Sequence, residues 1–247
     1  MTTAASLPLR EPVRELGALG VKAFTTTRAA GDFGLGDGEP SPAAIARWQS
    51  LQLDLAPVAP RLASARQMHG VRILEHGVTW DGWLRTDGAD GHLSVSPGIA
   101  CAVTVADCVP VFIAHPSGAI ALLHAGWRGT AARIVQKGIQ RMGERALAAS
   151  DLRLHLGPAI CGRCYVVGTD VFQQLTGWTT SRPRNVDLRA LIAEQAKDAG
   201  VTHITVSEYC TRCDNNRFFS HRAGDAGRQV GVIISPVAER DSRRTSR

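Results

Sequence analysis

Three residues with soft metal-ligating side chains, His69, Cys108 and His124, each lie where an apolar, strand-like run gives way to a turn. The surrounding strings are RQMHG at 66–70, CAVTVADC at 101–108 and AIALLHAGWRG at 119–129. Two imidazoles and one thiolate suit zinc, and three protein ligands leave a fourth position for water or substrate. The trio therefore predicts a catalytic metal site.

The same residues also have an ordinary structural interpretation. A histidine or cysteine at the end of a strand is commonly packed or solvated, and cysteine often acts as a small buried hydrophobe. Successive members of the trio are 39 and 16 residues apart, which matches no recognised zinc-finger or helical metal motif. Residue types and spacing alone leave both interpretations open.

Four other cysteines form two Cys-x-x-Cys pairs, Cys161 with Cys164 and Cys210 with Cys213. Two such pairs on tight turns are typical of a structural zinc site with four thiolate ligands. The long segment between the pairs, with two predicted helices in it, is unusual for a zinc ribbon. Buried or redox-idle thiols are the alternative.

Several strings resemble the YfiH/PgeF family, a laccase-domain group first labelled polyphenol oxidase. They are RQMHG, GADGHL at 88–93, VTVADCVPV at 103–111, LHAGWRGT at 123–130, GPAICGRCY at 157–165 and CTRCDNNRFFSHRAGDAGRQ at 210–229. The resemblance extends from about residue 21 to residue 234. It implies a zinc-dependent purine nucleoside phosphorylase, a pentosyltransferase, with adenosine deaminase side activity. Adenosine, inosine, guanosine or methylthioadenosine would be cleaved with phosphate to base and ribose 1-phosphate, and some members are tied to peptidoglycan-precursor editing.

The residues next to the predicted ligands also have candidate roles, which follow from their positions and side-chain chemistry. We expect Asp107 to act as general acid/base or to orient a ligand, although aspartate also commonly caps turns. Arg128 offers the planar fork that grips phosphate, unless it forms a surface salt bridge. Trp127 is expected to stack on the purine or to pack in the core, and Gln67 to contact substrate.

Further substrate-binding residues come from positions that match the family only in part. Arg28, in the string TTTR, matches a position near the pocket, but the glycine-rich loop at 29–40 departs from the family pattern. His221 stands where members more often have tyrosine, and Ala223 where they have a second arginine. His221 and Arg222 are predicted at the rim of the pocket.

Three other functions compete with the phosphorylase. An amidase that edits peptidoglycan precursors would use Cys108 as nucleophile and His124 as base. A copper-dependent polyphenol oxidase needs many imidazoles at short spacing, and the eight histidines include no His-x-His, so we expect copper only as an adventitious metal. A non-enzymatic, zinc-stabilised partner protein would require a closed site with four ligands.

Hydrophobic periodicity predicts the elements that position these residues. Helices are expected at 42–53, 130–148, 169–175 and 187–199, and strands at 21–27, 61–67, 71–76, 99–105, 109–115, 119–124, 152–156, 204–206 and 229–234. This order predicts an α/β fold with mixed sheets. The family resemblance implies more, namely a layered sandwich of mixed β-sheets flanked by helices.

Length and composition indicate one catalytic domain at 21–238, with an N-terminal extension at 1–20 and a disordered basic tail at 239–247. Four arginines and one aspartate at 240–247 account for half of the net charge of +6, so no binding to nucleic acid is expected. No apolar run has the length of a membrane span or a signal peptide, which predicts a cytoplasmic protein without membrane contact. We expect a monomer or weak homodimer.

Overall fold

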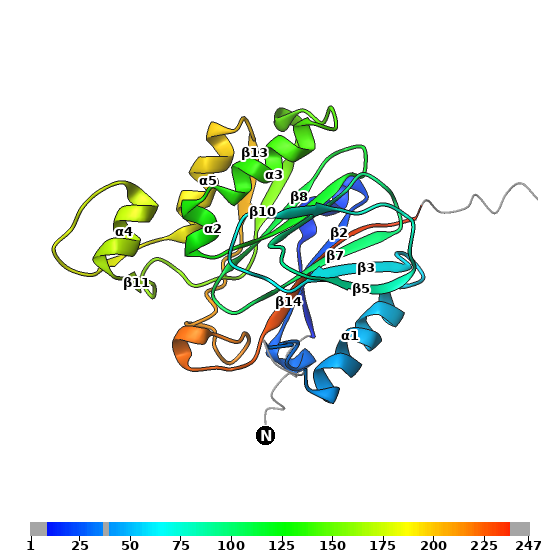
Figure 1. The fold of residues 1–247 in the computed structure, drawn as a ribbon, viewed down its shortest axis with the longest axis horizontal. Helices are drawn as coiled ribbons and strands as arrows, with labels where there is room; N and C mark the ends of the chain where they lie inside the picture. The colour runs from blue at the N-terminus through cyan, green and yellow to red at the C-terminus, as the bar shows by residue number, and fades with distance from the viewer. Residues whose placement is uncertain (1–8, 37–39, 238–247) are drawn as a thin grey trace, which may run out of the picture.

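Two six-stranded mixed β-sheets pack face to face in the computed structural model, which describes residues 9–36 and 40–237 (Figure 1). In order across sheet A the strands are β1 (Arg10–Pro12), β2 (Lys22–Thr26), β14 (Gln229–Ser235), β7 (Ile99–Val105), β3 (Arg61–Ala65) and β5 (Gly82–Thr86). Across sheet B they are β13 (His203–Val206), β10 (Arg153–Leu156), β8 (Val109–Ala114), β9 (Ile120–Ala125), β6 (Gly91–Ser94) and β4 (Ile73–Glu75). A separate pair joins β11 (Val166–Val167) to β12 (Arg184–Asn185).

Helices cover the outer faces of both sheets. The α-helices are α1 (Pro42–Leu55), α2 (Trp127–Ala131), α3 (Ile134–Gly143), α4 (Thr169–Thr176) and α5 (Leu188–Asp198), and the 3-10 helices are η1 (Arg14–Leu19), η2 (Arg28–Ala30), η3 (Ala149–Asp151) and η4 (His221–Ala223). In Figure 1, α1 lies beside sheet A, and α2, α3 and α5 lie together at the far side of the molecule. The order of the layers is therefore α1, sheet A, sheet B, and the group of helices α2, α3 and α5.

The alternation of apolar side chains along each strand explains this layering. In β7, Cys101 and Val103 face the space between the sheets, whereas Ala100 and Ala102 pack with α1 residues such as Trp48. Strands β8 and β9 alternate in the same way, with one set of side chains toward sheet A and the other toward the helices. Because both faces of these strands are buried, they read as continuous apolar runs. The predicted α/β class and layered sandwich are confirmed.

The prediction of one continuous helix at 130–148 is wrong. The segment predicted as a single helix at 130–148 is two helices, α2 and α3, and the longest helix is α1. Arg133 interrupts the segment with a left-handed backbone, at φ 60°. The carbonyl of Thr130 accepts hydrogen bonds from the Arg133 N–H (3.0 Å) and from the side chain of Gln195 in α5 (2.9 Å), which ends α2.

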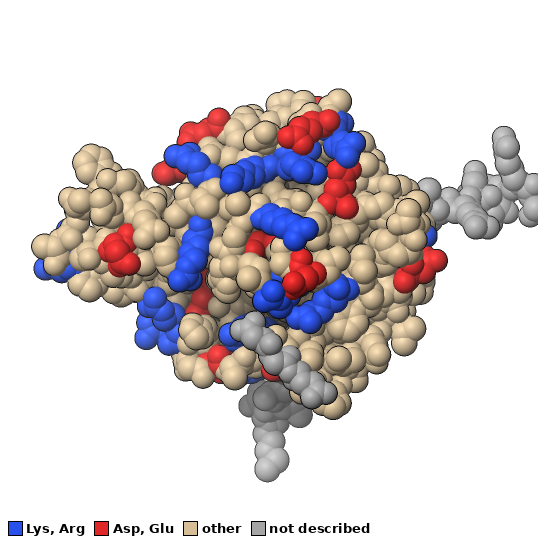
Figure 2. Space-filling view, viewed as in Figure 1, with Lys and Arg blue, Asp and Glu red and all other residues tan. Residues whose placement is uncertain are grey.

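Part of the predicted N-terminal extension at 1–20 lies within the described residues. Residues 10–19 belong to the folded body, since β1 pairs with β2 and Leu16 of η1 is buried. The predicted basic tail at 239–247 lies outside the described residues. Among the residues that the structure describes, no helix has the length and apolar character needed to cross a membrane. On the face shown in Figure 2, Lys and Arg side chains gather near the centre with Asp and Glu among them, so the positive charge there forms no unbroken stripe.

Candidate active site at the His69, Cys108 and His124 cluster

Two turns and one strand end bring the predicted metal ligands together. His69 follows β3, Cys108 lies in the turn between β7 of sheet A and β8 of sheet B, and His124 is in the last part of β9. Strand β3 runs parallel to β7, and β8 runs antiparallel to β9, so the two turns and the end of β9 lie at the same end of the sandwich. One ligand atom from each residue lies within 4.8 Å of the others. The sheet topology therefore brings together three residues that are far apart in the sequence.

Asp90, a residue to which the sequence assigned no role, fixes the orientation of both histidines. Its carboxylate accepts the Nδ1 hydrogen of His124 at 2.9 Å, which leaves Nε2 of that ring for the site. It also accepts the backbone N–H groups of Met68 (3.1 Å), His69 (2.8 Å) and Gly70 (2.7 Å), which hold His69 in a left-handed turn at φ 56°. A carboxylate behind a ligating histidine is the usual outer partner of a metal site.

Gly126 lets the chain after β9 approach the cluster closely. A Cβ at this position would lie 2.9 Å from Sγ of Cys108 and 3.3 Å from Cδ2 of His69. Contacts under 3.0 Å require a neighbour to shift, and here the neighbours are the predicted ligands. Gly126, the first glycine of the HAGWRG string, is therefore required by the packing of the site.

Electrostatics favour a thiolate at Cys108. Burial works against its ionisation, but the charge and hydrogen bonds of His124 and His69 outweigh burial and lower the pKa of Cys108 to about 6. Burial also disfavours a charged His124, yet Cys108 and Asp90 outweigh it and raise the pKa of His124 to about 9. The two shifts favour a thiolate at Cys108 beside a protonated His124, and a metal ion would bind with release of that proton.

The donor set fits zinc. Two imidazole nitrogens and one thiolate are typical zinc ligands, and a site with three protein ligands keeps a position open for catalysis. All three residues line a cavity of 540 Å³, so a metal ion held by them would be reachable from that cavity. A volume of this size is in the range of sites that bind small molecules.

Asp107 lies in the cavity wall and joins three segments. Its backbone is left-handed, at φ 82°. One carboxylate oxygen accepts the hydroxyl of Thr211 at 2.6 Å, and the other accepts the backbone N–H of Arg222 at 2.7 Å. The backbone carbonyl of Asp107 accepts the N–H of Ile160 at 3.1 Å. The carboxylate therefore bonds to two distant segments rather than to its own turn, and it also borders the cavity.

Two guanidinium groups in the lining are available to a ligand. Arg128 packs over the Trp127 ring, 4.4 Å from its centroid, and makes no hydrogen bond or ion pair within the described part of the chain. Arg85, in β5, also lines the cavity, and its guanidinium group makes no hydrogen bond or ion pair to any described residue. Sequence reasoning missed Arg85, because the short strand that carries it was not predicted. Trp127 is half-buried, with one part in the core and one part in the lining.

Arg28 and Gln67 have structural partners that occupy their side chains. Arg28 is not among the lining residues. It forms an ion pair with Asp225 at 2.6 Å, which lowers the pKa of Asp225 to about 2, and it hydrogen-bonds to backbone carbonyls at Asn215 and Phe218. Gln67 lines the cavity, but its amide makes three hydrogen bonds to one residue of β7, Thr104, at 2.7–2.9 Å. Of the two, only Gln67 forms part of the cavity wall.

His221 and Arg222 are in the lining, as predicted for the rim. Both are exposed and belong to η4, which Ser220 caps by accepting the Ala223 N–H at 3.2 Å. The Arg222 guanidinium lies 4.8 Å from the centroid of the Tyr165 ring and donates to the Val166 carbonyl at 2.8 Å. Tyr165, for which no role was predicted, also lines the cavity.

The two Cys-x-x-Cys pairs also meet in space, with their four sulfur atoms within 4.8 Å of one another. None of these cysteines lines the cavity of the first cluster. The chain therefore has two separate groups of soft ligands, one at the cavity and one beside it in the fold.

Comparisons with known proteins agree with this architecture. The family described as multi-copper polyphenol oxidoreductase laccase matches residues 26–236. A protein of Deinococcus radiodurans named purine nucleoside phosphorylase is 34% identical, with 96% of each chain covered. A protein named adenosine deaminase RL5, from an unknown prokaryotic organism, is 33% identical over 55% of this chain and 57% of its own. The crystal structure of YlmD from Geobacillus stearothermophilus superposes with a TM-score of 0.79, at 30% identity, over 87% of this chain and 91% of that one.

The match to the family covers sheet B, all of sheet A except β1 and most of β2, and every residue that lines the cavity. The motifs at His69, Cys108 and His124 lie within it. The chain belongs to this laccase-like family, the YfiH family that its sequence motifs resemble.

Proposed function

We propose that this protein is a zinc-dependent purine nucleoside phosphorylase with adenosine deaminase activity. One observation carries the proposal: a cavity of 540 Å³ has the His69, Cys108 and His124 group in its wall together with the guanidinium groups of Arg128 and Arg85, which make no hydrogen bond or ion pair to any described residue. An anion such as phosphate is the ligand that such groups favour. The names of the relatives from Deinococcus radiodurans and the unknown prokaryote support the same two reactions.

Each part of the cavity has a proposed role. Zinc bound by the three ligands would supply Lewis-acid chemistry next to the reacting groups. Arg128 and Arg85 bind and orient the phosphate through forked hydrogen bonds. The rings of Trp127 and Tyr165 offer faces on which a purine stacks. These contacts hold phosphate and nucleoside in one geometry, which lowers the entropic part of the barrier.

Asp107 is the proposed proton carrier. In phosphorolysis, a phosphate oxygen bonds to the anomeric carbon of ribose, the bond from that carbon to the purine nitrogen breaks, and its electron pair leaves with the base. The base then takes a proton, which Asp107 moves from phosphate. In deamination, water adds to the purine carbon and ammonia leaves, and Asp107 moves the proton from the water to the amine. Its hydrogen bonds from Thr211 and Arg222 hold the carboxylate in place for both steps.

The laccase description of the family does not by itself support copper oxidation. Within residues 9–36 and 40–237, only two groups of three or more metal-ligating side chains converge, and together they contain just two histidines. Multicopper centres need many imidazoles. The His69, Cys108 and His124 site suits one zinc ion, and copper would compete for this site as an adventitious ion.

A product assay tests the proposal. Zinc-loaded protein is incubated with adenosine or inosine, with and without phosphate, and the products are separated by chromatography. We expect free base and ribose 1-phosphate only with phosphate, and inosine from adenosine without it. Removal of zinc abolishes both activities, whereas a Cys108 amidase would keep or gain activity toward an amide substrate, because zinc no longer occupies its thiolate. Amide hydrolysis that rises on zinc removal would replace the proposal with the amidase.

A further inference from the structure

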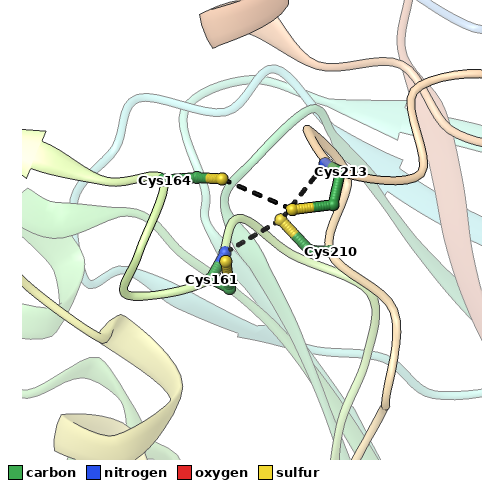
Figure 3. Close-up of side chains that lie close together, drawn as sticks. All are labelled: Cys161, Cys164, Cys210 and Cys213. Atoms are coloured by element: carbon green, nitrogen blue, oxygen red, sulfur yellow. Dashed lines mark hydrogen bonds between the residues drawn. The ribbon is translucent and has the colours of Figure 1, made fainter.

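The cysteines of the two Cys-x-x-Cys pairs converge from opposite ends of a long segment (Figure 3). Strands β10 and β13 are parallel neighbours, with Leu156 opposite Val206, so the segments that follow them leave sheet B at the same end of its strands. An isolated parallel bridge between Ala159 and Cys210 continues this pairing beyond the strands. The parallel pairing therefore places the turn after β10 against the turn after β13.

Each pair sits on a tight turn that directs both of its sulfur atoms to one side. In the first turn, the N–H groups of Cys164 and Tyr165 donate to the Cys161 carbonyl at 2.9 and 3.1 Å. In the second, the Asp214 N–H donates to the Cys210 carbonyl at 2.8 Å. Figure 3 shows the four side chains directed toward one another from the two turns. Such turns are the usual carriers of Cys-x-x-Cys metal ligands.

The spacing of the sulfur atoms suits one metal ion. All four lie within 4.8 Å of one another, and the Cys164 and Cys213 sulfurs are 3.5 Å apart. A tetrahedral zinc ion with bonds of about 2.3 Å to sulfur has about 3.8 Å between its ligand atoms. Small side-chain movements convert the observed cluster into that tetrahedron.

The surroundings stabilise negative charge on sulfur. Sγ of Cys210 accepts backbone N–H groups from Cys161 at 3.2 Å and from Cys213 at 3.5 Å. Each pair also encloses an exposed arginine, Arg163 in the first and Arg212 in the second. Four thiolates and one zinc ion have a net charge of about −2. The two arginines carry two positive charges, equal in number and opposite in sign to that charge.

We propose that Cys161, Cys164, Cys210 and Cys213 bind a structural zinc ion, separate from the metal at the cavity. Four protein ligands close the coordination sphere, so this ion binds no substrate. Four cysteines can also hold an iron–sulfur cluster, and sulfur atoms this close together can also form two disulfides. Metal content, X-ray absorption and intact mass distinguish these three states.

The ion would connect two turns that lie next to residues of the cavity wall. Tyr165 follows Cys164 directly and lines the cavity, and Thr211, between Cys210 and Cys213, donates its hydroxyl to Asp107. Zinc binding therefore fixes the position of the proposed proton carrier without touching substrate. This inference does not depend on the proposed reaction, since it concerns a second metal and the rigidity of two turns.

Metal content of matched variants, purified under reducing conditions, tests the site. We expect two zinc ions per chain in the wild type and one in Cys108→Ala. The double variant with Cys164→Ser and Cys213→Ser should retain one. Cys101→Ala changes a buried cysteine outside both groups and should keep two.

X-ray absorption at the zinc edge of Cys108→Ala then reads the second site alone, with the four cysteines intact, so that the result does not depend on whether the double variant folds. We expect sulfur ligands only, at about 2.3 Å. Three results would overturn the proposal: a Cys108→Ala protein that binds no zinc even after zinc is added, iron and sulfide in place of zinc, or loss of four hydrogens from the intact mass through two disulfides.

Discussion

Asp90 accepts the Nδ1 hydrogen of His124 at 2.9 Å while it also accepts three successive backbone N–H groups of the turn that carries His69. One buried carboxylate thus fixes two of the three ligands at the cavity. Burial alone would raise the pKa of Asp90, but the hydrogen bonds from His124 and from this turn outweigh it and keep the carboxylate ionised.

Asp90→Asn should weaken zinc binding at the cavity by about 10- to 100-fold, the usual effect of losing the outer partner of a metal-ligating histidine. The amide cannot accept from Nδ1 and from the turn with both of its polar atoms. Zinc affinity is measured by competition with a chromophoric chelator, in a protein whose four-cysteine site is already occupied. Asp81→Asn, an exposed substitution on the ion pair with Arg61, is the control and should leave affinity unchanged. Equal affinities for both variants would remove Asp90 from the site.

Gly126→Ala should disrupt the cavity metal site, because the added Cβ would meet Sγ of Cys108 at 2.9 Å. The matched control is Gly143→Ala at the end of α3, where an added Cβ meets nothing within 4 Å. That control should keep its metal and, as a glycine replaced in a helix, gain up to about 1 kcal/mol of stability. Full zinc occupancy in Gly126→Ala would show that the ligands have more room than the packing indicates.

Asp107→Asn should keep zinc and folding but lose about 10²–10⁴-fold in turnover, since the amide cannot carry a proton. Asparagine tolerates the left-handed backbone of this position, and it can still accept the Arg222 N–H and donate to Thr211. Asp107→Ala is the comparison, because it loses both hydrogen bonds and should also lower the melting temperature. Near-normal turnover in Asp107→Asn would leave only the structural role of this residue.

Arg128→Lys should raise the KM for phosphate more than the KM for nucleoside, because lysine keeps the charge but loses the fork. The same substitution at Arg85 should act in the same direction. Arg145→Lys, on an exposed ion pair with Glu75, serves as control. If the KM for phosphate does not move in either cavity variant, neither guanidinium binds phosphate.

The buried pair His76 and His92 predicts acid sensitivity of the fold. Burial is the main cause that lowers the pKa of both, that of His92 to about 3, and their rings share a hydrogen bond of 2.9 Å. A histidine whose pKa is lower in the folded state stabilises the fold above its ordinary pKa of about 6.5. That contribution is lost as pH falls toward 3, by up to about 1.4 kcal/mol per pH unit. Melting temperatures between pH 7 and 4 should fall less steeply in His92→Gln than in the wild type. Parallel curves would mean that the pair does not control acid stability.

Some of the fold was predictable because local signals agree with tertiary packing. Ser41 and Pro42 predicted the start of α1, and the Ser41 hydroxyl does accept the Ala44 N–H at 3.1 Å. Strand β7 appears at the predicted residues, since an apolar run with both faces buried has few alternatives. The interruption at Arg133 had no local signal, because no glycine or proline marks it and the apolar spacing continues across it.

Less of the site was predictable, since it depends on contacts between distant segments. His69, Cys108 and His124 were found through their types and motifs. Asp90 lies within the GADGHL string, but no local pattern indicates its role. Its function comes from hydrogen bonds to a turn about 20 residues away in sequence. Arg28 was expected at the substrate, yet its charge is balanced by Asp225, which no local pattern relates to it.

The most direct test of the central claim is phosphorus NMR of zinc-loaded protein with inosine and phosphate. We predict that the wild type converts inorganic phosphate to ribose 1-phosphate in proportion to the hypoxanthine released. Cys108→Ala, with its four-cysteine site intact, should form no ribose 1-phosphate. Release of hypoxanthine without a matching loss of inorganic phosphate, or full activity in Cys108→Ala, would contradict phosphorolysis at this cluster.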